Sequence, residues 1–244
     1  QVEVTFAEKS NTSADARVEL QATGRTCDRL VQSMDFRFLY HPRKKVLSVG
    51  FDLSSNQLQS ACYDLLASES RIASFIAIAK GDIPQEAWFH LGRAHTLCDG
   101  RRVLLSWTGT MFEYLMPMLW MRHHHGTITD ESTRAAVESQ RRLGSRRGIP
   151  WGISESGYVH AEGEYGYAPF GLSTLALRPA MPQKLVISPY ASFLALEVDP
   201  IAAVRNLREM DSLGWSGKYG LYEAADYADG GPSLVRSWMA HHLG

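Results

Sequence analysis

The sequence has few cysteines, almost no net charge and no long hydrophobic run. Its 244 residues include three cysteines without a CxxC pair, so we expect no disulfide framework and a reducing compartment. The 25 Lys and Arg residues balance 26 Asp and Glu, and the net charge of −1 gives no global field for nucleic acid. The longest apolar run, Leu115–Met121, is far shorter than the ~18–20 residues of a membrane-spanning helix.

Sequence signatures of cofactor and metal sites are also missing. There is no GxGxxG after a predicted strand, no phosphate-binding GxxxxGK[ST] and no GxSxG elbow, so we predict no nucleotide cofactor and no serine hydrolase. His123–His125 are consecutive on a predicted helix end and should point in different directions, and the pair His241–His242 is interpreted in the same way. We therefore predict no metal site. The arginines between 141 and 147 are interpreted as a solvated helix face, not a nucleic-acid site.

The composition is that of a soluble globular chain, with 45% hydrophobic and 21% charged residues. Hydrophobic spacing predicts helices over 13–34 and 57–80, with further helices between 84 and 148 and between 189 and 213. A β-hairpin is predicted over 36–52, and residues 149–181 and 214–230 are predicted as loops rich in glycine and aromatic residues. The chain opens without Met and ends within a helical pattern, so we interpret 1–244 as one domain or a fragment of one, with the helix before residue 34 the least certain element.

Glu69 is the first candidate for chemistry. On a helix over 57–80 its neighbours three and four positions away are apolar: Leu65, Leu66, Ile72 and Ala73. A carboxyl group on such a face loses hydration, which raises its pKa and allows it to act as a general acid near neutral pH. The alternative is an ion pair between Glu69 and an arginine such as Arg71 or Arg134.

Glu155 lies between glycines and aromatic residues in the segment Trp151–Tyr158. Aromatic rings stack on the C–H faces of sugars, carboxylates bind their hydroxyl groups, and glycine lets a backbone approach the ligand. The alternative is a turn whose glutamate caps a helix. Glu113 and Glu223 have similar aromatic surroundings, and four such carboxylates together favour a sugar site.

Five segments carry a resemblance to a known family: Met34–Tyr40, Tyr63–Arg71, Leu105–Pro117, Trp151–Ser156 and Val235–His242. Together they resemble the glycoamylase-like cyclization domain of cyclic β-1,2-glucan synthases, in the family's order from Met34 onward. The resemblance implies a mainly α fold, an (α/α) toroid of the six-hairpin barrel type, with a small β-hairpin and the glycine and aromatic loops at one rim. A full toroid needs about twelve helices, and a chain of this length supplies fewer.

The resemblance also implies an activity and site residues. It implies anomer-retaining transglycosylation that closes linear β-1,2-glucan into a ring, with Glu69 and Glu155 as the catalytic pair. Glu155 would act as nucleophile or as base. The lining of the sugar subsites would include six residues: Asp64, Trp107, Glu113, Tyr158, Tyr167 and Glu223. No cofactor or metal is implied. The implied setting is a cytoplasmic domain of an inner-membrane bacterial synthase, with the other domains of that enzyme as partners.

Two other functions compete with transglycosylation. A related endo-β-1,2-glucanase would use the same carboxylates, because water and a sugar hydroxyl compete for one intermediate. A non-catalytic fragment that binds glucan or packs against neighbouring domains is the third possibility. The sequence alone leaves these alternatives open.

Overall fold

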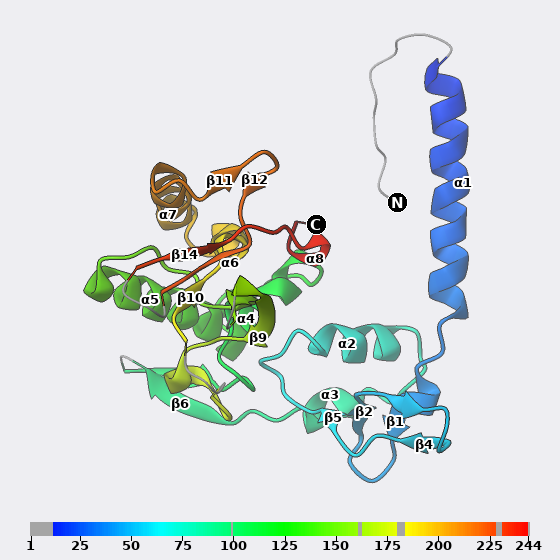
Figure 1. Cartoon of the computed structure of the whole chain (residues 1–244). Helices are drawn as coiled ribbons and strands as arrows, with labels where there is room; N and C mark the ends of the chain where they lie inside the picture. The colour runs from blue at the N-terminus through cyan, green and yellow to red at the C-terminus, as the bar shows by residue number, and fades with distance from the viewer. Residues whose placement is uncertain (1–11, 99, 161–162, 180–183, 228–230, 244) are drawn as a thin grey trace.

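The chain begins with a long helix that projects from the rest of the molecule (Figure 1). The computed structural model describes residues 12–98, 100–160, 163–179, 184–227 and 231–243. Helix α1 (Thr12–Ser33) matches the helix predicted over 13–34, and residues 15–33 are all exposed. Its attachment includes the Lys80 ammonium group, which donates to the carbonyl of Val31 at 2.7 Å. Within the described residues, no helix is long and apolar enough to cross a membrane.

A small sheet with two helices follows α1. The hairpin predicted over 36–52 is confirmed, since β1 (Tyr40–His41) pairs with β2 (Val46–Ser48) in antiparallel register. The other elements of this part are η1 (Arg37–Leu39), β3 (Phe51–Asp52), β4 (Gln57–Leu58), β5 (Cys62–Tyr63), α2 (Arg71–Ala79) and α3 (Glu86–His90). A small core of four residues lies between the sheet and these helices: Leu47, Ala77, Ile83 and Ala87.

The helix predicted over 57–80 is wrong in its first half. Strand β5 pairs with β2, and a tight turn with Asn56 at φ +53° joins β3 to β4. Pairing with strands distant in sequence therefore overrides the local helical pattern, and α2 begins only at Arg71. Glu69 lies in the turn before α2 and not on its apolar face.

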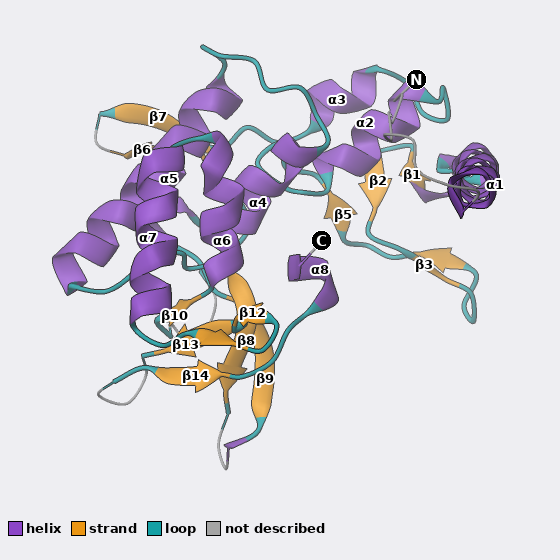
Figure 2. Ribbon diagram, turned by 90° about the horizontal axis from the view of Figure 1, so that it is seen from above, coloured by secondary structure: helices purple, strands orange, loops and turns teal. Residues whose placement is uncertain are grey.

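The larger part of the molecule is built around packed helices (Figure 2). They are α4 (Met111–Leu115), η2 (Met116–Leu119), α5 (Ile128–Arg147), α6 (Pro189–Leu194), η5 (Ala195–Glu197), α7 (Pro200–Ser212) and α8 (Ala240–Leu243). Their ends follow sequence signals: Thr127 caps α5, Gly148 ends it at φ +64°, and Asp199 caps α7 before Pro200. Pro117 changes the predicted long helix to a 3-10 turn after α4.

The segments predicted as glycine and aromatic loops contain strands. Residues 149–181 hold the hairpin of β8 (Glu155–Val159) and β9 (Tyr165–Pro169). The remaining elements are β6 (His95–Cys98), β7 (Arg101–Leu104), η4 (Ser173–Leu175), β10 (Val186–Ile187), β11 (Ser216–Gly217), β12 (Gly220–Leu221), β13 (Ala224–Asp226) and β14 (Ser233–Val235). Strands β10, β13 and β14 form an antiparallel sheet in that order. Part of residues 149–181 and 214–230 lies outside the described residues.

The prediction of a mainly α, (α/α) toroid is wrong for this chain. The structure is 43% helical and 21% strand, with several small sheets, and is a mixed α/β fold. Gly166 lies between two tyrosines in β9. Its missing side chain leaves room for a ring from the neighbouring strand, which allows the two strands to pair. A Cβ atom on Gly166 would lie 2.6 Å from the Tyr158 ring.

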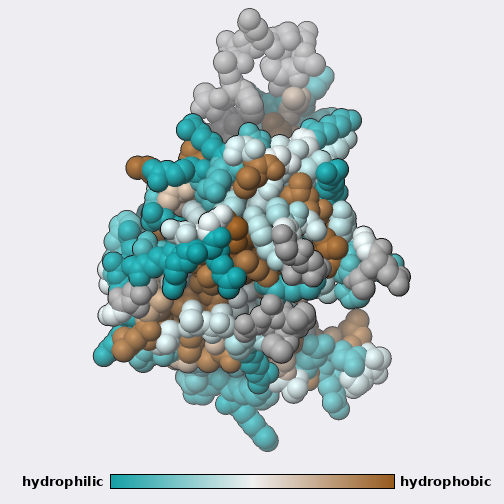
Figure 3. Space-filling view, turned by 60° about the vertical axis from the view of Figure 1, so that its left-hand side comes forward, coloured by the Kyte–Doolittle hydropathy of each residue, from teal (hydrophilic) through white to brown (hydrophobic). Residues whose placement is uncertain are grey.

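The main core joins the helices to the sheets. Its largest fully buried side chains include Trp215, Tyr114 and Met210, and it extends to Ile187 in β10 and Val235 in β14. On the face seen in Figure 3, hydrophilic residues surround patches of apolar ones. The core thus fixes α4, α5 and α6 against the strands that carry the candidate site.

Candidate active site

Glu69 is held in a turn between β5 and α2. Its carboxylate accepts a hydrogen bond from the Ser68 hydroxyl at 3.2 Å, and the amide of Ile72 donates to its backbone carbonyl. Within the described part of the chain, Glu69 has no ion-pair partner. Buried Arg71 donates to the carbonyl of Leu66 at 3.1 Å instead, and Arg134 binds Asp130 at 2.9 Å. The ion pair considered as an alternative for Glu69 is therefore absent from these residues.

Glu155 is the first residue of β8, and the segment before it is fixed by buried side chains. The Gln140 side chain of α5 binds both the amide and the carbonyl of Ile153, at 2.9 and 2.8 Å. The Ser154 hydroxyl accepts from the Phe112 amide of α4, and the Tyr190 hydroxyl lies 2.7 Å from it. Four polar contacts from three helices therefore fix the position of the backbone directly before Glu155.

Glu113 belongs to the same site, but its carboxylate is hydrogen-bonded to groups of its own loop. It forms a capping box with Thr110 at the start of α4. Its carboxylate also accepts from the Ser106 hydroxyl at 2.9 Å and from the Thr108 hydroxyl at 3.0 Å. Only 5% of Glu113 is exposed, so it holds the loop 106–110 and has little surface to offer a ligand.

The structure brings Glu69, Glu113 and Glu155 close enough to influence each other's charge. Partial burial raises the pKa of Glu69, and the charges of Glu113 and Glu155 raise it further. Burial also raises the pKa of Glu155, while the hydrogen bond from Tyr167 and the charge of His242 oppose that rise. The two predicted catalytic carboxylates therefore share one site in different electrostatic surroundings.

Glu69 lines a pocket with a volume of about 360 Å³. The pocket is lined by Tyr63, Glu69, Ser70, Ile72, Ala73, Met116 and Trp120. Trp120 is 72% exposed and was not singled out in the sequence analysis. The signal for its exposure is Pro117, which lies in the 3-10 turn that ends α4 just before Trp120. A largely apolar pocket with an exposed indole and a carboxyl group can bind a sugar ring.

Asp64 lies beside this pocket, next to Tyr63 in sequence. Its Oδ1 atom is buried and has no hydrogen-bond partner among the described residues. Buried carboxylate oxygens are normally paired, so the unpaired Oδ1 of Asp64 is an exception in this structure. Trp107 is half-buried in the neighbouring loop, where the Arg178 guanidinium lies 5.3 Å from the centre of its ring.

The two tyrosines predicted to line the sugar site lie on opposite faces of the β8–β9 hairpin. Tyr167 pairs with Gly157, on the same face as Glu155, and its hydroxyl donates to the Glu155 carboxylate at 3.1 Å. Tyr158 is three residues from Glu155 and so points to the other face. There it packs edge-on against Phe170 at 5.4 Å and under the ammonium group of Lys184. The structure brings Tyr167, but not Tyr158, to Glu155.

Glu223 is buried behind Glu155 and not on the surface. Its carboxylate accepts from the Gly157 amide at 3.1 Å and is paired with His242 Nδ1 at 2.9 Å. The absence of a side chain at Gly157 leaves room for it, since a Cβ atom there would lie 3.2 Å from Glu223 Cγ. His242 and Tyr190, which the sequence analysis did not place in the site, thus contact its carboxylate cluster.

Two histidines and an aspartate lie close together between η2 and the first turn of α5. His123 and His125 were expected at a helix end, but they lie in a non-helical segment and both face Asp130. One ligand atom from each of these three residues lies within 4.8 Å of the others. The same Asp130 oxygen accepts from His123 at 2.7 Å and from Arg134 at 2.9 Å, so the arginine already neutralises this carboxylate.

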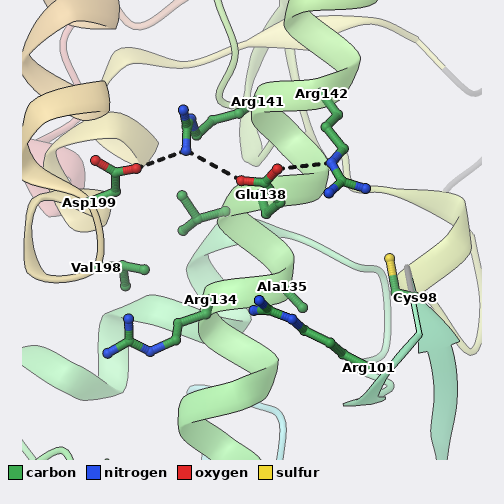
Figure 4. Close-up of a pocket in the computed structure, with 10 residues that line it drawn as sticks. Cys98, Arg101, Arg134, Ala135, Glu138, Arg141, Arg142, Val198 and Asp199 are labelled. Atoms are coloured by element: carbon green, nitrogen blue, oxygen red, sulfur yellow. Dashed lines mark hydrogen bonds and ion pairs between the residues drawn. The ribbon is translucent and has the colours of Figure 1, made fainter.

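A second concave region is lined by arginines of α5 and β7 (Figure 4). This pocket has a volume of about 410 Å³. Arg141 lies between two carboxylates in it, at 3.3 Å from Glu138 and 2.8 Å from Asp199, and Arg142 binds Glu138 at 2.9 Å (Figure 4). None of the site residues predicted from the sequence lines it, so it is separate from the carboxylate cluster.

Comparison with known proteins identifies the family. A family model named Glycoamylase, with the description "putative glucoamylase", matches residues 62–244. The chain belongs to the glycoamylase family. The match includes Glu69, Glu113, Glu155 and Glu223, so the whole carboxylate cluster lies in the family's region. Membership places the chain among carbohydrate-active proteins.

Individual relatives support this membership of the glycoamylase family. The chain is 44% identical over 220 residues to cyclic β-(1,2)-glucan synthase NdvB of Rhizobium meliloti, covering 87% of this chain and 8% of that protein. An endo-β-1,2-glucanase from Chitinophaga pinensis, solved with sophorotriose and glucose, has a similar fold, with a TM-score of 0.66 and 19% identity. It aligns with 86% of this chain and 54% of that one. A Bacteroides caccae structure with the same description as the family gives a TM-score of 0.68 at 18% identity, over 86% and 55% of the two chains.

Two facts limit what the glycoamylase relatives show. The chain spans about half the length of the solved structures that it resembles and a small part of the synthase. At identities below 20% the solved structures show a shared fold. The roles of individual residues must therefore be argued from this site.

Proposed function

We propose that this domain acts on β-1,2-linked glucan and performs anomer-retaining transglycosylation, closing a linear chain into a ring. The observation that carries the proposal is the pair Glu69 and Glu155, which come from separate elements, share one partly buried site and both have a raised pKa. The name of the Rhizobium meliloti relative, a cyclic β-(1,2)-glucan synthase, and that of the Chitinophaga pinensis glucanase support this substrate class.

In the proposed first step Glu69 is the general acid. Its raised pKa keeps a proton on the carboxyl group at a higher pH than an exposed glutamate would, because burial and two nearby carboxylates disfavour its charge. Transfer of this proton to the glycosidic oxygen breaks the bond to the anomeric carbon. The reducing-end part of the chain then leaves with a hydroxyl group.

Glu155 is the proposed partner on the other side of the bond. As a nucleophile it attacks the anomeric carbon and forms a covalent glycosyl ester, the first of the two displacements that together retain the anomer. As a base it would accept the proton of an attacking hydroxyl group in a single displacement, which inverts the anomer. Direct attack with retention requires the two carboxyl groups about 5–5.5 Å apart, whereas ~6.5–9.5 Å leaves room for a relaying hydroxyl or water. On the nucleophile route, a hydroxyl group at the other end of the same glucan then attacks the anomeric carbon and displaces Glu155. Glu69 takes the proton of that hydroxyl group, so both residues return to their starting states.

Four residues are proposed to bind the sugar chain around this pair. Asp64 offers its unpaired buried oxygen, Tyr167 holds Glu155, and Trp107 and Trp120 offer rings for stacking. Tyr158, Glu113 and Glu223 are proposed to act indirectly, by shaping the hairpin and the loops that carry the others.

The same site supports hydrolysis as a second candidate function. Water can replace the acceptor hydroxyl, and the solved Chitinophaga pinensis structure belongs to an endo-β-1,2-glucanase. Incubation of the chain with linear β-1,2-glucan, with counting of reducing ends, separates the functions. We expect the number to stay constant or fall while rings appear. A rise would establish hydrolysis, and no change in any product would indicate a non-catalytic binding or packing domain.

The proposed setting follows from the synthase relative. We propose that residues 1–244 form a single domain, or a fragment of one, of a larger membrane-associated synthase and lie on the cytoplasmic side. The other domains of that synthase would be its partners.

A further inference from the structure

Behind Glu155 lies a buried ion pair that the proposed reaction does not yet use. His242 of α8 and Glu223 have side chains that are 3% and 2% exposed, and His242 Nδ1 lies 2.9 and 3.1 Å from the two carboxylate oxygens. The amide of Gly157 in β8 donates to the same carboxylate. Burial of a charged pair is costly unless its partners are well placed, so this pair has to be explained.

The imidazole is built into the support of Glu155. Its ring stacks on Tyr190 with centroids 3.8 Å apart and planes inclined by 16°. The Tyr190 hydroxyl in turn donates to the carbonyl of Glu155 at 2.9 Å. The Tyr167 ring stacks on the same imidazole at 6.2 Å, and its hydroxyl binds the Glu155 carboxylate. His242 therefore touches both residues that hold Glu155.

We propose that His242, paired with Glu223 and stacked on Tyr190, is a positioning residue that favours the ionised form of Glu155 beside Glu69. The proposal rests on the proposed function for the pairing of these two carboxylates. It gives the site an electrostatic asymmetry: a histidine cation acts on Glu155, whereas Glu69 has two carboxylates near it.

The charged and titratable groups around His242 fit this role. Glu223 and Glu155 are the carboxylates near His242, and burial raises the pKa values of Tyr167 and Tyr190, so both phenols remain neutral. His241 is the opposing neighbour, with ring centroids 4.0 Å apart. Burial and the charge of His242 lower the pKa of His241, so the neutral form of His241 is favoured. Nε2 of His242 is buried without a partner among the described residues.

The test needs no substrate. In the isotope-labelled whole chain, NMR titration follows the His242 imidazole and the Glu155 carboxyl group. Coupling between two ionising sites is reciprocal, so Glu155→Gln should lower the pKa of His242 by the same amount that His242→Gln raises the pKa of Glu155. Glu223→Gln should also lower the pKa of His242. Titrations that do not move overturn the proposal.

A rate measurement adds the functional readout. With β-1,2-glucan as substrate, His242→Gln should move the acidic limb of the pH profile of kcat/KM to higher pH and leave the basic limb in place. A lower kcat with an unmoved acidic limb would mean that His242 only packs, which contradicts the proposal. His90→Gln, at an exposed histidine of α3, is the matched control and should change neither limb.

The two proposals fail in different ways. A chain that is inactive on β-1,2-glucan but shows the reciprocal titration shifts would contradict the proposed function alone. An active chain without those shifts would contradict the role of His242 alone. Thermal unfolding of each variant checks that the shifts come from a folded chain.

Discussion

Glu69 and Glu155 both have a raised pKa, and burial is the largest cause in each case. Partial burial raises both pKa values, and only Glu155 has a cation and a phenolic donor that oppose the rise. The sequence predicted the raised pKa of Glu69 from a helix face that does not exist. The direction is right because Glu69 is partly buried in the turn before α2 and the charges of Glu113 and Glu155 act on it there.

The raised pKa of Glu69 predicts a pH-dependent cost in stability. A carboxyl group whose pKa is higher in the folded state stabilises the fold below its unfolded pKa, and that contribution is lost as pH rises through the folded pKa. Glu69→Gln removes the charge, so its free energy of unfolding should exceed that of the wild type at pH 7. The advantage should disappear as the pH falls below about 4.

Denaturant unfolding of both proteins across that pH range measures the difference. Glu197→Gln, at an exposed glutamate in η5, is the control and should show no such advantage. A Glu69→Gln variant that is less stable than the wild type at pH 7 would contradict the burial argument.

The carboxylates of the site are held by elements that local sequence patterns identified only in part. Gly148 and Asp199 act within one turn of chain and indicate the end of α5 and the start of α7, whereas the cap of α5 is Thr127 and not the pair Thr129 and Asp130 that the pattern favours. The strands β5, β8 and β9 were missed, since their pairing depends on partners that the local pattern does not contain. The proximity of Glu69 to Glu155 likewise depends on long-range packing, and only the family resemblance pointed to it.

Gly109 gives a prediction at the level of these elements. It lies at φ +76° in the loop that Glu113 holds, and a Cβ atom would lie 2.3 Å from the carbonyl oxygen of Leu172. Gly81 has φ +75° but nothing within 4 Å of such an atom. Gly81→Ala should therefore cost only the ~1–2 kcal/mol of a left-handed conformation.

Gly109→Ala should cost clearly more, because two backbone segments must separate. Thermal unfolding of the two variants compares the conformational cost with the cost of the close approach. Equal losses would show that the contact between the Gly109 loop and Leu172 is not tight in solution.

At the scale of the whole molecule, α1 is the least integrated element. All its described side chains from residue 15 onward are exposed, and the family match begins only at residue 62. The core that carries the site instead joins α4–α7 to the sheet of β10, β13 and β14. The site therefore depends on the body of the chain and not on its first helix.

Removal of residues 1–33 should consequently be tolerated. We expect Tm to change by only ~1–2 °C, since few buried contacts are lost. Calorimetry on the truncated and whole chains measures this change. A fall in Tm beyond 10 °C, the equivalent of roughly 3–5 kcal/mol, would show that α1 packs on the body.

The central claim is that Glu69 and Glu155 act together on a glycosidic bond, and turnover of linear β-1,2-glucan by their glutamine variants tests it most directly. An amide keeps the shape of the side chain but cannot give a proton or attack, so each variant should lose a factor of about 10²–10⁴ or more in kcat. Glucan binding and folding should persist, and Glu113→Gln should lose less. Glu197→Gln should match the wild type. Full activity in Glu69→Gln or in Glu155→Gln would contradict the account.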